Sequence, residues 1–332
     1  MAMRELTMVQ ALNEALQEEM ARDGKIFCLG EDVADPYGGA YQITKGLANR
    51  FGADRCRNTP ISEAAIVGVA VGAAQTGLRP VAELMYMDFM GVCFDQILNQ
   101  MAKLRFMLGG QVSLPMIVRG QQGSGRGNGA QHSQSLEAFF FHTPGLLVVQ
   151  PSNPYDAKGL LKSCLRQDNP VIFLEHKMLY NVKGPVPDEE YVVPLGVADI
   201  CREGSDVTVV ATGLMVNRAK AAAARLAEEG ISVELIDPRT LFPLDLESIV
   251  GSVMKTGRCI IVHEANKRGG VGAEIAAQIM ERAFDYLDAP VERLAGLDIP
   301  MPYAPHLEKA AVPQEDDIVL AARRLVREGG LR

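Results

Sequence analysis

The sequence has no long hydrophobic segment, no paired cysteine motif and no excess of positive charge. Residues 1–20 lack the apolar core of a signal peptide and the character of a transit peptide. The six cysteines form no C-x-x-C pair, which argues against a disulfide framework or a zinc site and favours reduced thiols. The 33 basic and 41 acidic residues leave a net charge of −8, which is unfavourable for binding nucleic acid or anionic membranes. We therefore expect a cytoplasmic protein.

Instead, the chain contains two series of alternating strand and helix patterns. Its 332 residues predict about two domains that bury roughly three quarters of the unfolded surface. Strand-like segments occur at 26–31, 80–86, 115–120, 147–150 and 171–175, and then at 207–212, 232–237, 259–264 and 291–296. This spacing predicts an α/β protein with two doubly wound parallel sheets. The expected domains are 1–181 and 196–332, joined by a linker at 182–195 that contains three prolines.

Several helices can be delimited from local signals. Thr7 and Gln10 form a possible capping box for a helix that runs to about Arg22. A long helix is expected near 89–108, and an acidic segment at 314–317 precedes a last helix ending near Arg327. Other helices are expected at 155–166, 216–229, 246–255 and 272–286. Phe139, Phe140 and Phe141 cannot all face one core, because consecutive helix positions lie ~100° apart, so we expect at least one to face another subunit.

The stretch from Pro60 to Leu78 holds a single charge, Glu63, at the start of a predicted helix. Ser62 is the expected N-cap, with its hydroxyl accepting a backbone N–H. Small residues recur at every fourth position in two adjoining stripes, which predicts that another helix packs closely against this one. Gln75 interrupts the apolar run before the ~20 residues that a membrane span needs.

Glu63 allows two interpretations. It is either a solvated acid in a helix first turn, favoured by the helix dipole, or a carboxyl group that packing shields from water. In the second case burial would raise its pKa and make it a proton donor to a ligand nitrogen. The spacing from Glu63 to Gly68-Val69 and Gly72-Ala73 resembles the E-x4-G-Φ-x-x-G-Φ motif of the pyrimidine-binding domain of thiamine diphosphate enzymes, which favours the second interpretation.

Two glycine-rich segments are candidates for anion binding. The loop at 120–129 has neither the dinucleotide spacing nor the G-K-[ST] of a phosphate loop, so we expect a flexible active-site loop. Gly269–Gly272 follows a strand and precedes a helix, a position suited to anions, although a plain turn also explains it. His132 follows the first loop, where a lone histidine is usually just solvated.

Longer segments extend the resemblance over almost the whole chain. These are AQHSQ around His132, GLRPVAELMYMDF (77–89), DQILNQMAK (95–103), HTPGLLVVQPSNPYDAKGLL (142–161) and DPRTLFPLD (237–245). The chain thereby resembles the β subunit of the thiamine-diphosphate-dependent first component of 2-oxoacid dehydrogenase complexes, of the pyruvate or acetoin type. The resemblance implies a transketolase-like pyrimidine-binding domain followed by a transketolase C-terminal domain.

The resemblance also implies roles for particular residues. Ile61, Glu63, Met85 and Phe89 would surround the aminopyrimidine of thiamine diphosphate, with Glu63 as its hydrogen-bonding acid. His132 would lie in the channel and move protons during acyl transfer to the lipoyl group of an acyltransferase component. An optional potassium ion would be held, largely through backbone carbonyls, by Met116, Cys164, Leu165, Gln167 and Asn169.

The chain has no G-D-G motif, which in this family opens the site for the diphosphate and magnesium. The resemblance therefore implies that a separate α subunit supplies that half of the site and the Mg²⁺, in a two-α, two-β heterotetramer.

Three alternatives remain open. A non-catalytic dinucleotide- or flavin-binding electron carrier with two α/β units needs a glycine fingerprint that the first unit lacks. A one-chain transketolase-like enzyme is disfavoured by the missing G-D-G and by the chain length. A scaffolding subunit without chemistry is disfavoured by the presence of Glu63 and His132. The resemblance leaves pyruvate and acetoin both as candidate substrates.

Overall fold

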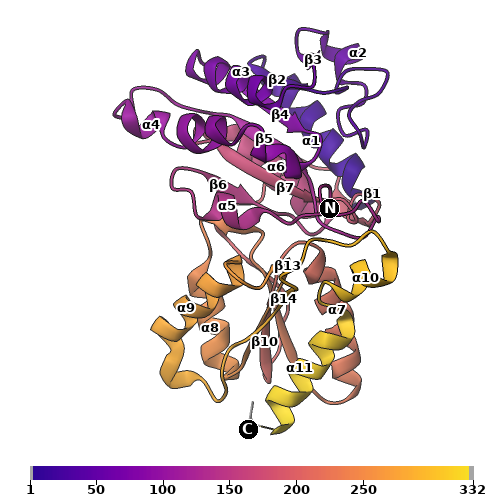
Figure 1. Ribbon diagram of the computed structural model, residues 1–332, viewed down its shortest axis with the longest axis vertical. Helices are drawn as coiled ribbons and strands as arrows, with labels where there is room; N and C mark the ends of the chain where they lie inside the picture. The colour runs from indigo at the N-terminus through magenta and orange to yellow at the C-terminus, as the bar shows by residue number, and fades with distance from the viewer. Residues whose placement is uncertain (1–2, 329–332) are drawn as a thin grey trace. The chain divides into compact units, whose positions relative to one another are not determined.

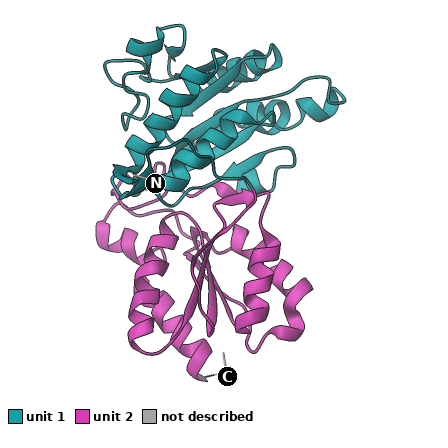
Figure 2. Ribbon diagram, turned by 180° about the vertical axis from the view of Figure 1, so that it is seen from behind, with its two compact units in different colours: residues 1–122, 139–195 teal, residues 123–138, 196–332 magenta. Residues whose placement is uncertain are grey.

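The computed structural model describes residues 3–328 and divides the chain into two compact units (Figure 2). Unit 1 contains the residues up to Gln122 together with Phe139–Leu195. Unit 2 contains Gly123–Ala138 and the residues from Gly196 onward. The glycine-rich loop, which we expected in the first domain, is thus grouped with unit 2.

A parallel sheet forms the centre of unit 1 (Figure 1). Its strands run in the order β6-β7-β5-β4-β2-β3, and each neighbouring pair is parallel. Nearly every residue of β2, β4, β5 and β7 is buried, as expected for a parallel sheet covered on both faces. The bounds are β2 (Ile26–Gly30), β3 (Cys56–Asn58), β4 (Arg79–Leu84), β5 (Ile117–Gln122), β6 (Leu147–Val149) and β7 (Val171–His176).

The helices of unit 1 confirm some local predictions and correct others. The predicted capping box is present, with Gln10 N donating to Thr7 Oγ1 at 3.2 Å and Thr7 N donating to Gln10 Oε1 at 2.8 Å. The bounds are α1 (Met8–Arg22), α2 (Leu47–Phe51), α3 (Glu63–Gln75), α4 (Leu104–Met107), α5 (Glu137–Phe141) and α6 (Pro154–Arg166). In α5, Phe140 is buried and Phe139 is 52% exposed, so the three phenylalanines do diverge.

The single long helix predicted at 89–108 is wrong. A 3-10 helix, η1 (Met87–Gly91), a π-helix, η2 (Gln96–Met101), and the short α4 take its place. In η2, Ala102 N bonds Ile97 O at 3.0 Å, an i→i+5 bond that interrupts the regular ladder.

The predicted linker at 182–195 is not wholly irregular, because it contains β8 (Lys183–Pro187). This strand pairs antiparallel with β1 (Met3–Thr7), so that Met3 lies opposite Pro187 and Thr7 opposite Lys183. Within the described residues, β8 pairs with β1 alone. Proline is tolerated in such an edge position because one side of the strand needs no ladder hydrogen bonds. The prolines therefore led to the prediction of a linker where the structure has a strand.

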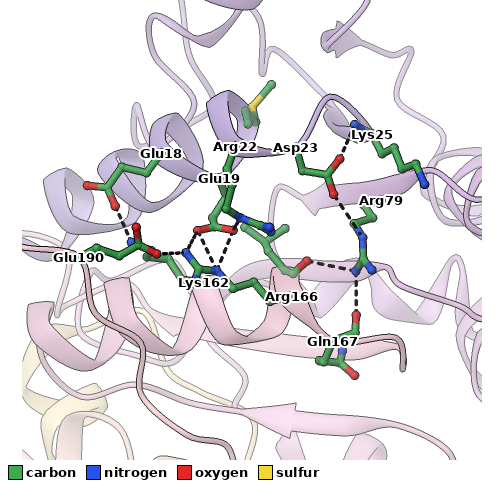
Figure 3. Close-up of polar contacts among 12 residues, drawn as sticks. Glu18, Glu19, Arg22, Asp23, Lys25, Arg79, Lys162, Arg166, Gln167 and Glu190 are labelled. Carbon is green, nitrogen blue, oxygen red and sulfur yellow. Dashed lines mark hydrogen bonds and ion pairs between the residues drawn. The ribbon is translucent and has the colours of Figure 1, made fainter.

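Ion pairs connect α1 to α6 (Figure 3). The fully buried Lys158 donates to Glu14 at 3.0 Å and to Glu18 at 2.7 Å, and the buried Lys162 donates to Glu18 at 2.7 Å. Arg166, one turn further along α6, bonds the buried Glu19. Burial alone would raise the pKa of Glu18, but its bonds to the two lysines outweigh this and lower it.

Unit 2 is built on a second sheet with the strand order β14-β13-β10-β11-β9. Four of the strands are parallel as predicted, but the edge strand β9 pairs antiparallel with β11. Helices α7 and α11 pack together beside β10, and α8 and α9 form the other pair (Figure 1). The bounds are β9 (Asp199–Arg202), β10 (Val207–Ala211), α7 (Leu214–Glu228), β11 (Val233–Asp237), β12 (Thr240–Phe242), α8 (Leu246–Thr256), β13 (Cys259–Asn266), α9 (Val271–Ala283), η3 (Phe284–Tyr286), β14 (Glu292–Gly296), α10 (Pro305–Ala310) and α11 (Glu315–Glu328). The predicted α/β architecture is confirmed.

His263 is enclosed in unit 2 by the glycines of the predicted strand-to-helix turn. It lies on β13 and is 1% exposed. A Cβ atom at Gly270 would lie 2.5 Å from its ring, and one at Gly272 would lie 2.7 Å away. The glycines at these two positions therefore make room for the imidazole, which favours the plain-turn interpretation over an anion site. Burial lowers the pKa of His263 to about 4.

This low pKa predicts a loss of stability in mild acid. Below about pH 6.5 the unfolded chain gains a proton at this position that the folded chain binds only near pH 4. The stability is thus intact above pH 6.5 and falls as the pH drops toward 4. Between pH 7 and 5 the wild type should lose about 2 kcal/mol more unfolding free energy than His263→Gln, measured by denaturant melts. The exposed His142→Gln serves as control, and parallel curves for wild type and His263→Gln would contradict the prediction.

Candidate active site

The predicted cofactor-binding residues lie at one edge of the sheet in unit 1. Because its strands are parallel, their carboxyl ends meet at this edge, where open α/β sheets bind ligands. Glu31 directly follows β2, Ile61 and Glu63 follow β3, and the segment from Met85 to Phe89 follows β4. The topology thus brings the four predicted residues, which come from two separate segments, to the same sheet edge as Glu31 from a third.

Glu63 is the first residue of α3 and is 6% exposed. The interpretation of a solvated first-turn acid is therefore wrong for this carboxyl group. The predicted capping role of Ser62 is also wrong, because its side chain makes no capping hydrogen bond although it occupies the N-cap position. Its backbone carbonyl accepts from Ile66 N at 2.9 Å instead. The Ser62 side chain lies along a groove beside α3.

A second buried carboxyl group, missed by the sequence analysis, lies in the electrostatic field of Glu63. Glu31 is 9% exposed, and its Oε1 atom is buried with no hydrogen-bond partner among the described residues. Burial raises the pKa of Glu31, and the charges of Glu63 and then Asp32 raise it further. A buried acceptor without a donor is costly unless a ligand supplies one. An aminopyrimidine, which carries an amino group and ring nitrogens, has the polar groups that such a pair of carboxyls would bind.

Apolar and aromatic side chains occupy the neighbouring segments after β3 and β4. Ile61 is 81% exposed, and the Phe89 ring packs against Tyr86 with centroids 5.6 Å apart. Gln121 Nε2 donates to Met85 O at 2.8 Å and fixes the turn after β4. A flat heteroaromatic ring is suited to this mixture of partly exposed apolar side chains and buried acids.

The small-residue face of α3 is open in this chain. Gly72 has no atom within 4 Å of a would-be Cβ, whereas at Gly68 that Cβ would lie 3.3 Å from Gln96 of η2. A groove of about 810 Å³ runs beside α3. Its apolar walls include Ala65, Ile66, Val69, Ala73 and Leu78. The predicted close packing of another helix is thus met at Gly68, where η2 contacts α3, but no described residue covers the helix at Gly72.

His132 belongs to unit 2 and is partly buried at the end of the glycine-rich loop. Two carboxylates bind the backbone of this loop. Glu264 accepts from Ser124 N at 2.6 Å, and Glu308 accepts from Gly125 N at 2.7 Å and Gly127 N at 3.0 Å. These bonds argue against a freely flexible loop. No sequence signal identified Glu308, which is far away in the chain and 4% exposed.

The residues predicted to bind potassium are gathered around the turn between α6 and β7, but they fit the ion poorly. The oxygens expected from Met116, Cys164, Leu165, Gln167 and Asn169 already accept hydrogen bonds from protein donors. Two of those donors are guanidinium groups. Like charges would oppose a bound cation there.

Comparison with known domain families assigns both halves of the chain. The pyrimidine-binding domain of transketolase matches residues 4–183, and the transketolase C-terminal domain matches residues 196–318. A solved structure described as a split-gene transketolase, inactive β4 tetramer, superposes with a TM-score of 0.81 at 25% identity and covers 97% of this chain and 98% of its own. The fold is therefore that of a transketolase-type protein.

Curated relatives narrow the class. The β subunit of acetoin:2,6-dichlorophenolindophenol oxidoreductase from Cupriavidus necator is 48% identical over 98% of this chain and 99% of its own. The mitochondrial pyruvate dehydrogenase E1 β subunit of Dictyostelium discoideum is 49% identical over 98% of this chain and 92% of its own. The 2-oxoisovalerate dehydrogenase β subunit of Bacillus subtilis is 46% identical over 96% of this chain and 98% of its own. The chain belongs to this family of transketolase-like dehydrogenase β subunits.

Membership of this family supports the dehydrogenase interpretation over the electron-carrier alternative. The family is one of oxidoreductases, and its transketolase-type pyrimidine-binding domain implies thiamine diphosphate as the cofactor. Among residues 3–328, no helix is long and apolar enough to cross a membrane.

The bonds from Glu308 predict that one substitution will loosen the glycine-rich loop. Glu308→Gln keeps the shape but replaces one acceptor oxygen with a donor, so one of the amides of Gly125 and Gly127 loses its partner. Amide hydrogen exchange at 123–129 should accelerate roughly 10-fold or more, since a bond to a charged group contributes about 1.5–3 kcal/mol. The exposed Glu274→Gln is the control. Unchanged exchange in Glu308→Gln would show that the carboxylate does not hold the loop.

Proposed function

We propose that this chain is the β subunit of a thiamine-diphosphate-dependent first component of an acetoin or 2-oxoacid dehydrogenase. It would contribute the half of the active site that holds the aminopyrimidine. The main supporting observation is the burial of Glu63 at the start of α3, in the field of Glu31, whose Oε1 atom lacks a partner. Near-equal identity to acetoin and pyruvate enzymes leaves both as candidate substrates.

In this proposal each site residue has a separate task. Glu63 holds a proton against a pyrimidine nitrogen, in a place where burial excludes water from the carboxyl group. Ile61, Met85 and Phe89 hold the ring by apolar contact. When bound, thiamine diphosphate supplies the nucleophilic carbon and the electron sink for decarboxylation or carbon–carbon cleavage.

The other half of the site would come from an α subunit. Without a G-D-G motif, this chain lacks the usual sequence for binding the diphosphate and its Mg²⁺. Part of the small-residue face of α3 is open, since no described residue lies within 4 Å of a Cβ built at Gly72, and this suits close packing by a helix of another subunit. We therefore propose a two-α, two-β heterotetramer that delivers acyl groups to a lipoyl acyltransferase core. The cytoplasmic location stays a prediction.

His132 would act in the later half of the reaction. Its loop is held at Ser124 by Glu264 and at Gly125 and Gly127 by Glu308, which limits where the imidazole can lie. An imidazole exchanges protons near neutral pH more readily than other side chains. We propose that it moves protons while the acyl group passes to the lipoyl thiol.

The split site predicts that activity depends on assembly. The chain alone should bind thiamine diphosphate weakly in calorimetry and catalyse no turnover, because it would bind only the pyrimidine. Co-expression with its α subunit should yield a complex that reduces a dye with acetoin or a 2-oxoacid. Robust magnesium-dependent turnover by this chain alone would contradict the split site.

Glu63 can be tested within that complex. Glu63→Gln keeps the side-chain size but removes the acid, so proton exchange at the reactive carbon of the cofactor should slow by roughly 10²–10⁴-fold. The matched control is Glu247→Gln, which changes an exposed first-turn acid of α8. Wild-type exchange in Glu63→Gln, in a complex of normal assembly, would leave Glu63 with a structural role only.

A further inference from the structure

The turn between α6 and β7 brings together carbonyl oxygens that an ion could use. Leu165 and Gln167 lie at the C-terminal end of α6, where the last carbonyls lack intrahelical partners. The negative end of the helix dipole adds to their attraction for a cation. A positive charge is therefore favourable at this end of α6, and a bound hard cation could supply it.

In this chain the positive charge comes from a side chain. Arg79, at the start of β4, donates from Nη1 to Leu165 O at 3.1 Å and to Gln167 O at 2.9 Å. Its Nη2 bonds Asp168 Oδ1 at 2.7 Å, and its Nε lies 3.5 Å from Asp23 Oδ2. Figure 3 shows the guanidinium between Asp23 and Gln167. Its side chain is 20% exposed, so the two carboxylates hold it in a largely enclosed position.

The remaining oxygens of the predicted ion site are also engaged. Met116 O accepts from Val171 N at 2.9 Å, and Cys164 O accepts from Gln167 Nε2 at 3.4 Å. A second guanidinium, that of Arg105, donates to the Asn169 side chain and to Asp168 O at 3.2 Å. An ion bound by these oxygens would lie close to two fixed positive charges, because the same oxygens accept hydrogen bonds from Arg79 and Arg105.

We propose that the Arg79 guanidinium takes the place of a bound potassium ion at the C-terminal end of α6, so that this chain is stable without potassium. Asp23 and Asp168 act as its counter-charges and direct its two Nη1 bonds at the carbonyls. This inference does not depend on the catalytic proposal, since it concerns the folding of unit 1 alone.

The test compares salts that differ only in their cation. The full-length wild type is melted in KCl, NaCl and tetramethylammonium chloride at equal ionic strength, and Rb⁺ is used as a potassium probe in equilibrium dialysis. The wild type should melt at the same temperature in all three salts and retain no Rb⁺. One Rb⁺ bound per chain, or a melting temperature raised by potassium but not by sodium, would overturn the proposal.

Variants of Arg79 test the replacement itself. Arg79→Met removes the charge and should lower the melting temperature by roughly 3–10 °C in sodium. Potassium should restore part of that loss, because the carbonyls are then free for an ion. Equal losses in both salts, or no loss, would refute the role of the guanidinium as a stand-in for the ion.

Two further variants serve as controls. Arg79→Lys keeps the charge and should remain indifferent to potassium, and it replaces Arg79→Met if the latter does not fold. Potassium dependence in Arg79→Lys would count against the proposal. Arg57→Met removes an exposed guanidinium that is paired with Asp54 among the described residues, and it should behave as the wild type in every salt.

Discussion

The buried Arg119 guanidinium fixes the sheet edge on which the candidate site depends. It lies on β5, 1% exposed, and bonds Glu175 of β7 through two nitrogens at 2.6 Å and Glu83 of β4. Tyr180 Oη also donates to Glu175, at 2.7 Å. A buried charge that loses its partner costs several kcal/mol. The three strands must therefore keep the register that places Glu83 opposite Arg119, and this register sets where the site segments after β4 and β5 begin.

Helix α6 shows the same use of internal cations. Lys158 and Lys162 face the carboxylates of α1 from one side of the helix, and Arg79 reaches its last carbonyls from β4. Each of these cations has at least one carboxylate partner, and Lys158 and Arg79 have two acceptors or more. Such multiple bonding offsets the loss of hydration that makes a lone buried cation costly. The packing of α6 against α1 and its connection to β4 thus depend on side-chain charges that are all encoded in this chain.

The sequence predicts structural features that depend on the spacing of neighbouring residues. It does not predict features that depend on contacts between residues far apart in the chain. The capping box of Thr7 and Gln10 and the strand at 259–264 follow from neighbouring residues. Glu63 was identified by its motif, and only the packing of α3 shows that it is buried. The roles of Glu31, Glu308 and Arg79 have no local signal, because their partners lie up to 183 residues away. The sequence analysis missed β8 because its prolines argue against a strand. They are tolerated because β8 pairs with β1 on one side, and its other side needs no ladder hydrogen bonds.

The hydrogen bonds of the glycine-rich loop also support the split-site proposal. Gly123, Gly125, Gly127 and Gly129 all have positive φ, a conformation that glycine adopts without steric cost. Backbones of this kind bind phosphate in other proteins. Here the amides of Gly125 and Gly127 already bind the Glu308 carboxylate, and that of Ser124 binds Glu264. A fixed internal carboxylate repels and outcompetes an external anion, so this loop is poorly suited to hold a diphosphate. The diphosphate half of the site is then better supplied by another subunit, and the loop is free to position His132.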